Sequence, residues 1–158
     1  MGRIVDFREL GTLVDQARED GQSIVLTNGA FDLLHVGHVR YLQGAGEHGD
    51  RVLAAVNSDS SVKALKGPER PMIPEGERAE MVAALGVVDW VVIFSELTVE
   101  RVIEAVKPNV HAKGTDYTAE TIPERALVES FGGRVEIVGD PKDHSTTELV
   151  EKLGESQQ

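Results

Sequence analysis

The chain has 158 residues, a length that suits one globular domain, and 41% of them are hydrophobic, enough for a sizeable core. Its formal net charge of −11 argues against nonspecific binding to nucleic acid or to an anionic membrane, because both need a basic protein surface. The absence of cysteine excludes disulfides, thiolate catalysis and cysteine-ligated zinc.

The sequence predicts neither a signal peptide nor a membrane span. Residues 1–22 contain several acidic side chains and lack a continuous apolar core. No apolar run reaches the thickness of a bilayer. We therefore expect a cytoplasmic protein that has no membrane partner.

The first predicted element is a helix over residues 7–19, within an N-terminal helical segment of residues 1–22. Its apolar residues are three, one and three positions apart and form a single stripe. They are Leu10, Leu13, Val14 and Ala17. Gly21 ends this helix.

A buried strand is predicted next, over residues 24–26, where three aliphatic residues follow one another. Asn28 and Gly29 are expected to end it. Apolar residues then fall three apart from Val36 onward, which predicts a helix over residues 36–47.

Two histidines, His35 and His38, lie at this strand-to-helix turn. The unpaired N–H groups and partial positive charge of a helix N-terminus suit an anion such as phosphate, and Gly37 leaves room for a ligand near the backbone. A purely structural pair of histidines is one alternative. A zinc site is another, but Asp32 is the only acidic residue nearby and the chain has no cysteine.

A second buried strand, over residues 50–56, ends in the polar run Asn57, Ser58 and Asp59. Ligands of parallel α/β sheets bind beyond the carboxyl ends of the strands, so these side chains are candidates for a binding site. Turn or cap formation explains them equally well, because Asn, Ser and Asp favour both.

Residues 63–78 are the most basic part of this acidic chain and are predicted to form a loop, because three prolines interrupt them. A run of charge is usually a solvated surface, but this one follows a strand end that could bind a ligand. We expect Lys66 and Arg78 to contact phosphates, and Lys63 and Arg70 to be more solvated.

The remaining predicted elements continue the alternation of strands and helices. The strands cover residues 87–94, 110–113 and 135–138, and the helices follow Pro74, follow a Thr98 cap and cover residues 123–131. A last helix begins at Ser145-Thr146-Thr147, where Ser145 and Glu148 have the spacing of a capping box. Residues 154–158 are expected to fray.

Five strands that alternate with helices predict one Rossmann-like α/β domain over residues 1–158. The expected sheet is five-stranded and parallel, with helices on both faces. A dinucleotide-binding fold of the dehydrogenase type is disfavoured, because no G-x-G-x-x-G follows the first strand.

The residue pattern offers no evident protein nucleophile: there is no cysteine and no G-x-S-x-G turn. This suits a direct displacement in which a substrate phosphate attacks the α-phosphorus of a nucleoside triphosphate, a reaction that needs alignment and charge stabilisation. His35, His38 and Lys66 are candidates for stabilising that charge. The hydroxyls of residues 145–147 are candidates for the other phosphates, unless they only cap a helix. Mg²⁺ is expected to be held chiefly by phosphates and water.

The histidine turn resembles a known signature. The stretch Gly29-Ala30-Phe31-Asp32-Leu33-Leu34-His35-Val36-Gly37-His38 resembles the G-x-F-D-x-x-H-x-G-H motif of the nucleotidyltransferase superfamily. Further segments resemble its heptose 1-phosphate adenylyltransferase domain. These are Val56-Asn57-Ser58-Asp59, Leu65-Lys66-Gly67, Arg70-Pro71, Glu77-Arg78, Val88-Asp89-Trp90-Val91-Val92, Lys113-Gly114-x-Asp116-Tyr117 and Ser145-Thr146-Thr147.

The resemblance implies that ATP and D-glycero-β-D-manno-heptose 1-phosphate react to give ADP-heptose and pyrophosphate, a step toward lipopolysaccharide core or another heptose glycan. It implies that the catalytic residues are His35, His38 and Lys66. It implies nucleotide contacts from Asn28, Gly29, Phe31, Asp32, Gly37, His38, Lys113, Gly114, Ser145, Thr146 and Thr147. It implies substrate contacts from Asn57, Asp59, Arg70, Arg78, Asp116 and Tyr117.

The resemblance also carries expectations about cofactors and partners. Mg²⁺ is expected to bind with the nucleotide phosphates, and no metal ligand is expected from the chain. A homodimer is expected. The family often carries a fused sugar kinase, which this sequence lacks, so a separate kinase is expected to supply the sugar phosphate.

Two alternatives stay open. One is a cytidylyltransferase that makes CDP-glycerol from CTP and glycerol 3-phosphate. Such enzymes carry R-T-E-G-I-S-T-T, whereas residues 140–147 here read Asp-Pro-Lys-Asp-His-Ser-Thr-Thr and lack the arginine. The other is a nucleotide-binding sensor without turnover, which the presence of His35, His38 and Lys66 disfavours.

Overall fold

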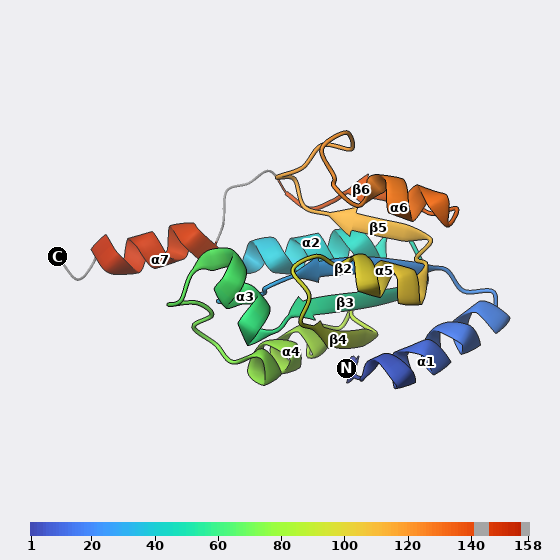
Figure 1. The fold of residues 1–158 in the computed structure, drawn as a ribbon, viewed down its shortest axis with the longest axis horizontal. Coiled ribbons are helices and arrows are strands. Elements are labelled where there is room, and N and C mark those ends of the chain that lie inside the picture. Colours follow the sequence, from blue (N-terminus) through green and yellow to red (C-terminus); the bar gives the residue numbers. More distant parts are fainter. Residues whose placement is uncertain (141–145, 156–158) are drawn as a thin grey trace.

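The computed structural model describes residues 1–140 and 146–155. In this part of the chain, a six-stranded sheet is flanked by helices (Figure 1). The strand order is β1-β4-β3-β2-β5-β6, and every neighbouring pair is parallel. The predicted α/β class with a parallel sheet is confirmed, but the predicted number of strands was one too few.

The strands are β1 (Arg3–Ile4), β2 (Ile24–Gly29), β3 (Arg51–Asn57), β4 (Trp90–Phe94), β5 (Val110–Lys113) and β6 (Arg134–Ile137). The helices are α1 (Phe7–Glu19), α2 (Val36–Gly46), α3 (Asp59–Lys66), α4 (Glu75–Ala83), α5 (Glu100–Val106), α6 (Arg125–Ser130) and α7 (Thr146–Glu155).

The strand that the sequence did not predict is β1. It has two residues, and it joins the sheet because Arg3 pairs with Trp90 and Ile4 pairs with Val91. Two residues are too few to show a periodic pattern. The helical prediction for residues 1–22 was therefore right for α1 and wrong for β1.

Three other boundaries differ from the predictions. Strand β2 continues through Gly29, which pairs with Val56 of β3. The predicted loop over residues 63–78 was wrong at its start, because α3 runs to Lys66, whereas the helix predicted after Pro74 is confirmed, since α4 begins at Glu75. The predicted cap at Thr98 is not formed, since no side chain caps α5.

Predicted fraying at the C-terminus is contradicted for two residues. Gly154 and Glu155 belong to α7, which projects from the body of the fold in Figure 1, whereas residues 156–158 lie outside the described residues.

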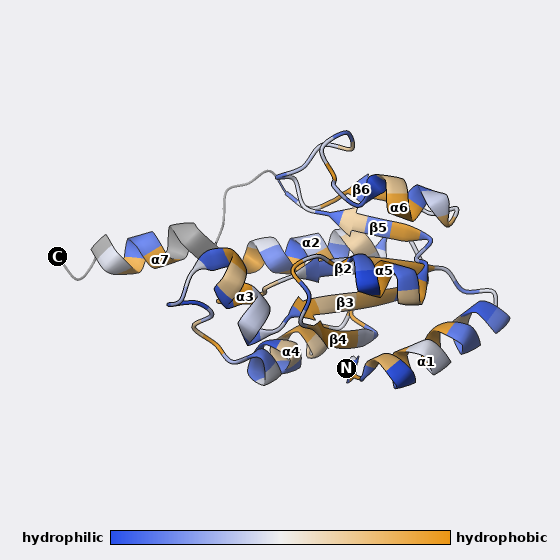
Figure 2. Ribbon diagram, viewed as in Figure 1, coloured by the Kyte–Doolittle hydropathy of each residue, from blue (hydrophilic) through white to orange (hydrophobic). Residues whose placement is uncertain are grey.

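Apolar side chains pack on both faces of the sheet, because the strands alternate their side chains between two helical layers. Leu53 and Ala55 of β3 pack with α1, α5 and α6, whereas Ala54 and Val56 pack with α4 and α2. Figure 2 shows the hydrophobic residues concentrated on the central strands. Trp90 is 6% exposed and belongs to the first of these clusters, so it is a core residue.

The topology singles out one edge of the sheet. The chain passes from β2 to β3 and β4 on one side and then returns to β5 on the other side of β2. The order of the strands thus reverses at β2, and ligands of open α/β sheets bind beyond the carboxyl ends of strands at such a point. Within the described residues, no helix is long and apolar enough to cross a membrane.

Candidate functional site

The two histidines of the strand-to-helix turn form the N-terminal cap of α2. The Gly37 N–H donates to His35 Nδ1 at 3.1 Å, and the His35 N–H donates to His38 Nδ1 at 3.2 Å. The two rings are stacked, with their centroids 3.9 Å apart. Because each Nδ1 accepts a hydrogen bond, each neutral ring carries its proton on Nε2. The cap therefore fixes the orientation and the tautomer of both imidazoles.

The electrostatics of this turn favour a neutral His38. Burial lowers the pKa of His38 to about 4, and the charges of His35 and Lys66 add to that effect. Burial also lowers the pKa of Lys66, together with the charge of Arg70. His38, Lys66 and Arg70 thus lie close enough to repel one another electrostatically when all are charged. Such a group of donors and cations at a helix N-terminus suits an anionic ligand.

Asp32 joins the histidine turn to the loop between α3 and α4. Its carboxylate is buried and accepts hydrogen bonds from Arg70 Nε at 2.9 Å, Met72 N at 2.9 Å and Ile73 N at 3.1 Å. Both oxygens are therefore engaged within the protein. This does not fit a direct nucleotide contact by the Asp32 side chain, and its role here is to hold two loops together.

Phe31 is likewise an internal residue of the turn. Its side chain is 2% exposed, its backbone φ is 50°, and its ring centroid lies 5.5 Å from that of His38. The ring packs in the core cluster beneath α2 and α4. It supports the imidazole of His38 rather than presenting a face to solvent, which does not fit a nucleotide contact by this side chain.

Arg70 has an unused donor. Its Nε binds Asp32, but Nη2 is buried and has no hydrogen-bond partner among the described residues. The side chain is 13% exposed, which contradicts the expectation that Arg70 is a solvated charge. Because a buried donor without a partner is costly, this guanidinium has a spare N–H group for an anion beside Lys66.

Arg78 is fully buried and all its hydrogen bonds are internal. It donates to the carbonyl oxygens of Ile73 at 2.8 Å, Ala30 at 2.5 Å and Asn57 at 2.8 Å, and to the Asp59 carboxylate at 2.8 Å. The expectation that Arg78 contacts a phosphate does not fit this geometry. Arg78 instead ties the carboxyl ends of β2 and β3 to the loop before α4.

The side chains of Asn57 and Asp59 also make hydrogen bonds within the protein. The Asn57 side-chain amide donates to Ser61 Oγ at 2.9 Å, whereas one carboxylate oxygen of Asp59 faces Arg78. The carboxylate of Asp59 is 42% exposed, so it remains accessible at this edge of the sheet. Ser58 caps α3, because its hydroxyl oxygen accepts from Ser61 N at 3.2 Å, so the structure supports the cap interpretation for Ser58, while a substrate contact by Asp59 stays a prediction.

Lys113, the last residue of β5, lies on the other side of β2. Its side chain is 8% exposed, with Nζ 3.8 Å from Glu124 Oε2 and 4.6 Å from the ring centroid of Tyr117. Burial lowers its pKa, and the charge of Glu124 raises it in part. Gly114 and Asp116 lie in the turn that follows. Their contacts with ligands stay predictions.

Two residues that hold Asn28, His111 and Tyr41, are not predicted from the sequence. His111 Nε2 lies 3.0 Å from Asn28 Oδ1, and the Tyr41 hydroxyl accepts from Asn28 N at 3.4 Å and donates to the Ala112 carbonyl at 2.6 Å. His111 has no exposed surface, and burial lowers its pKa to about 3. A polar residue inside the short strand 110–113 is the one signal that could have indicated it.

The structure thus brings His35, His38, Lys66 and Arg70 to one place, at the carboxyl edge of the sheet. Lys113 lies at the same edge, beyond β2. Ser145 lies outside the described residues. Thr146 and Thr147 begin α7, but the structure does not describe their side chains, so the predicted hydroxyl contacts stay predictions.

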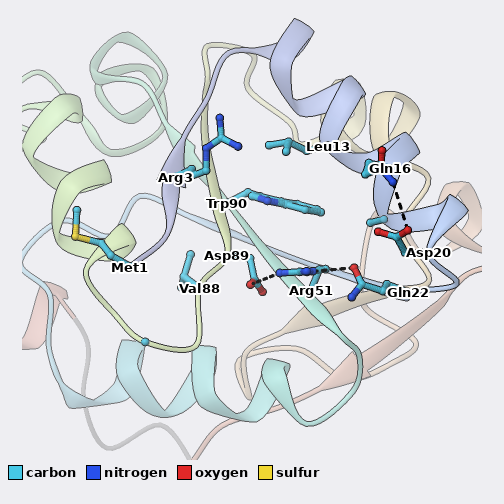
Figure 3. Close-up of a pocket in the computed structure, with 12 residues that line it drawn as sticks. Met1, Arg3, Leu13, Gln16, Asp20, Gln22, Arg51, Val88, Asp89 and Trp90 are labelled. Carbon is cyan, nitrogen blue, oxygen red and sulfur yellow. Dashed lines mark hydrogen bonds and ion pairs between the residues drawn. The ribbon is translucent and has the colours of Figure 1, made fainter.

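A cavity of about 370 Å³ lies at the opposite edge of the sheet, where Trp90, Arg51 and Asp89 line it (Figure 3). Two of its charged groups pair with each other, since Arg51 Nη1 lies 3.2 Å from Asp89 Oδ1, and Arg51 Nε also donates to Gln22 at 2.9 Å. Because this cavity opens at the amino ends of the strands, it is separate from the histidine site.

Among the residues that the structure describes, no group of three or more His, Asp or Glu side chains is placed to hold a metal ion. The described residues therefore do not form a metal cage around the histidines.

The chain is similar to a known protein family and to proteins named HldE. Residues 26–152 match a family model described as cytidylyltransferase-like. The chain is similar to the bifunctional protein HldE of Geotalea uraniireducens, with 50% identity over 151 residues that cover 96% of this chain and 31% of the relative. It is also similar to the bifunctional protein HldE of Geobacter metallireducens, with 48% identity and the same coverage. The chain thus spans about a third of the length of these curated relatives, 31% in each.

Two solved structures resemble the fold. One is a lipopolysaccharide core biosynthesis protein from Thermoplasma volcanium, with a TM-score of 0.63, 27% identity, and coverage of 74% of this chain and 94% of that chain. The other is pantoate-beta-alanine ligase from Francisella tularensis, with a TM-score of 0.65 and coverage of 92% of this chain and 69% of that chain. At 15% identity, the second similarity shows the fold alone.

The contacts of Arg78 predict a large effect on stability. Arg78→Met leaves three carbonyl oxygens and one carboxylate without their donor, and we expect the free energy of unfolding to fall by about 3–5 kcal/mol. Arg134→Met is the matched control, because its ion pair with Glu136 is exposed and is worth about 0–1 kcal/mol. Urea denaturation of both variants measures the difference. If Arg78→Met is as stable as the wild type but binds phosphate more weakly, the prediction that Arg78 contacts a phosphate is right and the structural role is wrong.

The buried histidines predict a loss of stability in mild acid. The folded pKa of His111 is about 3, below an ordinary value of 6.5, so the unfolded chain binds a proton that the folded chain excludes. The stabilisation is complete above about pH 6.5 and falls by about 1.4 kcal/mol per pH unit below it. We expect His111→Gln to flatten the decline of unfolding free energy between pH 6.5 and 4.5. Equal slopes in wild type and variant would contradict this assignment.

Proposed function

Because this chain belongs to the cytidylyltransferase-like family, we propose that it is a nucleotidyltransferase that joins the AMP moiety of ATP to a sugar 1-phosphate. The proposed acceptor is D-glycero-β-D-manno-heptose 1-phosphate, and the products are ADP-heptose and pyrophosphate. The resemblance of its motifs to heptose 1-phosphate adenylyltransferase domains supports this choice. Its 50% identity to a bifunctional protein HldE and its likeness to a lipopolysaccharide core biosynthesis protein support it further.

The observation that carries the proposal is the pair of capped imidazoles at the N-terminus of α2. Their Nδ1 atoms accept from backbone N–H groups, so each neutral ring carries its proton on Nε2. Lys66 and the spare guanidinium donor of Arg70 lie in the same region. A triphosphate needs this combination of fixed donors and cations, because negative charge must be held in place while a new P–O bond forms.

The reaction then needs no protein nucleophile. An oxygen of the sugar 1-phosphate attacks the α-phosphorus of ATP, and the bond between that phosphorus and the bridging oxygen of the β-phosphate breaks. Pyrophosphate leaves with the electron pair of that bond. The attacking oxygen is already ionised, so the protein does not have to remove a proton. His35, His38 and Lys66 donate hydrogen bonds to phosphate oxygens as charge shifts from the attacking phosphate to pyrophosphate.

The remaining parts of the proposal follow from the resemblance. Mg²⁺ accompanies the nucleotide phosphates and neutralises part of their charge. The enzyme acts in the cytoplasm, on ATP and a sugar phosphate, and it works as a homodimer.

The deciding experiment is a matrix of nucleotides and acceptors, read by pyrophosphate release. ATP, CTP, GTP and UTP are each combined with heptose 1-phosphate, other sugar 1-phosphates and glycerol 3-phosphate. We expect the highest turnover with ATP and heptose 1-phosphate. CTP turnover that equals or exceeds ATP turnover would replace this proposal with a cytidylyltransferase. Nucleotide binding without pyrophosphate release from any pair would indicate a sensor.

The histidine cap predicts a kinetic signature. His35→Ala and His38→Ala each remove one donor to the developing phosphate charge, and we expect kcat to fall by roughly 10²–10³. Binding of the sugar phosphate should change less. His48→Ala is the matched control, because His48 lies just beyond the other end of α2. Near wild-type turnover in a correctly folded His35 or His38 variant would refute the role of the cap.

Two lysines of α3 provide a second matched pair. Lys66→Ala removes a cation from the histidine site, and a lost charge-assisted hydrogen bond of about 1.5–3 kcal/mol lowers kcat/KM at least roughly tenfold. Lys63→Ala should change it much less, because Lys63 is exposed on the same helix. If Lys63→Ala is the more damaged variant, the loop after α3 does not face the phosphates.

A further inference from the structure

Glu124 is a buried acidic residue that has no role in the reaction proposed above. It occupies the position before the first turn of α6, and the residue is 9% exposed. Its Oε2 atom is buried and has no hydrogen-bond partner among the described residues. A buried carboxylate is costly unless a charge compensates for it. The nearest compensation is the ammonium of Lys113, 3.8 Å from Oε2.

Lys113 is held on two sides but keeps its donors. Glu124 and the ring of Tyr117 flank its ammonium, and its side chain is 8% exposed. The 3.8 Å separation from Glu124 exceeds hydrogen-bond range, so the carboxylate supplies charge without occupying an N–H group. Lys113 ends β5, the strand beside β2 at the point where the strand order reverses. Its ammonium is therefore placed at the edge where a ligand is expected to bind.

Glu124 forms an ion pair with Lys113, and Asp116 is a further acidic residue, in the turn after β5. The other titratable groups nearby are His111 on the same strand, Tyr41 of α2 and Tyr117 of the following turn. Burial lowers the pKa of His111 to about 3 and raises the pKa of Tyr41, so both are neutral at the pH of the cell. Burial by itself would favour a neutral Lys113, and Glu124 opposes that effect.

We propose that Glu124 is a positioning residue that keeps the Lys113 ammonium protonated and leaves its N–H groups free for an anionic oxygen of the substrate. This inference rests on the proposed function, in which ATP and a sugar phosphate bring negative charge to this edge of the sheet. It assigns to Glu124 an effect on the reaction that is transmitted entirely through Lys113.

The first test titrates Lys113 itself and does not depend on activity. Wild type, Glu124→Gln and Glu124→Asp are labelled with ¹³C-lysine, and Lys113→Arg identifies the signal by NMR. Removing the carboxylate disfavours the charged amine, so the pKa of Lys113 should fall by about one unit or more in Glu124→Gln and by less in Glu124→Asp. Glu120→Gln is the control, since Glu120 is exposed, and it should leave this pKa unchanged. An unchanged pKa of Lys113 in Glu124→Gln overturns the proposal.

The second test is the pH profile of kcat/KM with ATP and heptose 1-phosphate. Lys113→Met identifies which alkaline limb belongs to Lys113. In Glu124→Gln this limb should move to lower pH by the same amount as the pKa, which is about a tenfold loss where the wild type is still active. A uniform loss at every pH, in a protein with a normal melting curve, would show a merely structural Glu124 and overturn the proposal. A wild type that releases no pyrophosphate would refute the proposed function, and the NMR titration would still decide the role of Glu124.

Discussion

The buried carboxylate of Asp32 is the contact on which the rest of the candidate site depends. Burial acts to raise its pKa, but hydrogen bonds from Met72, Arg70 and Ile73 outweigh that effect and hold the pKa below its ordinary value. Asp32 therefore stays ionised and keeps the turn after β2 against the loop after α3. His35 and His38 follow Asp32 on one loop, and Arg70 lies on the other. The contacts of Asp32 therefore hold the loop that carries the imidazoles next to the loop that carries Arg70.

Arg78 is a second buried charged residue that joins separate segments by hydrogen bonds. One guanidinium serves carbonyl oxygens of three separate segments and the carboxylate of Asp59, so it fixes the ends of β2 and β3 relative to each other. A lysine could not replace it, because an ammonium lacks the planar fork that reaches several acceptors. The site thus rests on two buried groups, Asp32 and Arg78, that make several hydrogen bonds within the protein. Such a frame gives the preorganisation that stabilising a transition state requires.

The charge distribution is compatible with the anionic substrate that we propose for this acidic protein. The net charge of −11 repels phosphates at long range, but screening limits that field to roughly 8 Å at physiological salt. At short range, the positive charges of Lys66 and Arg70, which lie close to each other, offset this repulsion. Lys113 is a further cation on the other side of β2, and Glu124 forms an ion pair with it. The fold alone does not specify the chemistry, since a ligase at 15% identity shares it. The assignment therefore depends on these particular side chains and on the family match.

The sequence by itself determined the alternation of strands and helices, the histidine turn and the candidate residues at its carboxyl edge. These features are local: aliphatic runs, a three-residue spacing and a short motif are visible within a few positions of each other. Only the tertiary structure decided what the charged residues do. Arg78 and Asp32 were expected to face the ligand, but both bind other parts of the protein. The partners of Arg78 in other segments lie 19 to 48 positions away in the sequence, and those of Asp32 lie 38 to 41 positions away. The two-residue β1, the hold of His111 on Asn28 and the pairing of Lys113 with Glu124 were equally out of reach. A sequence shows which side chains carry charge, whereas burial and the partner across space decide whether that charge binds a ligand or holds the protein together.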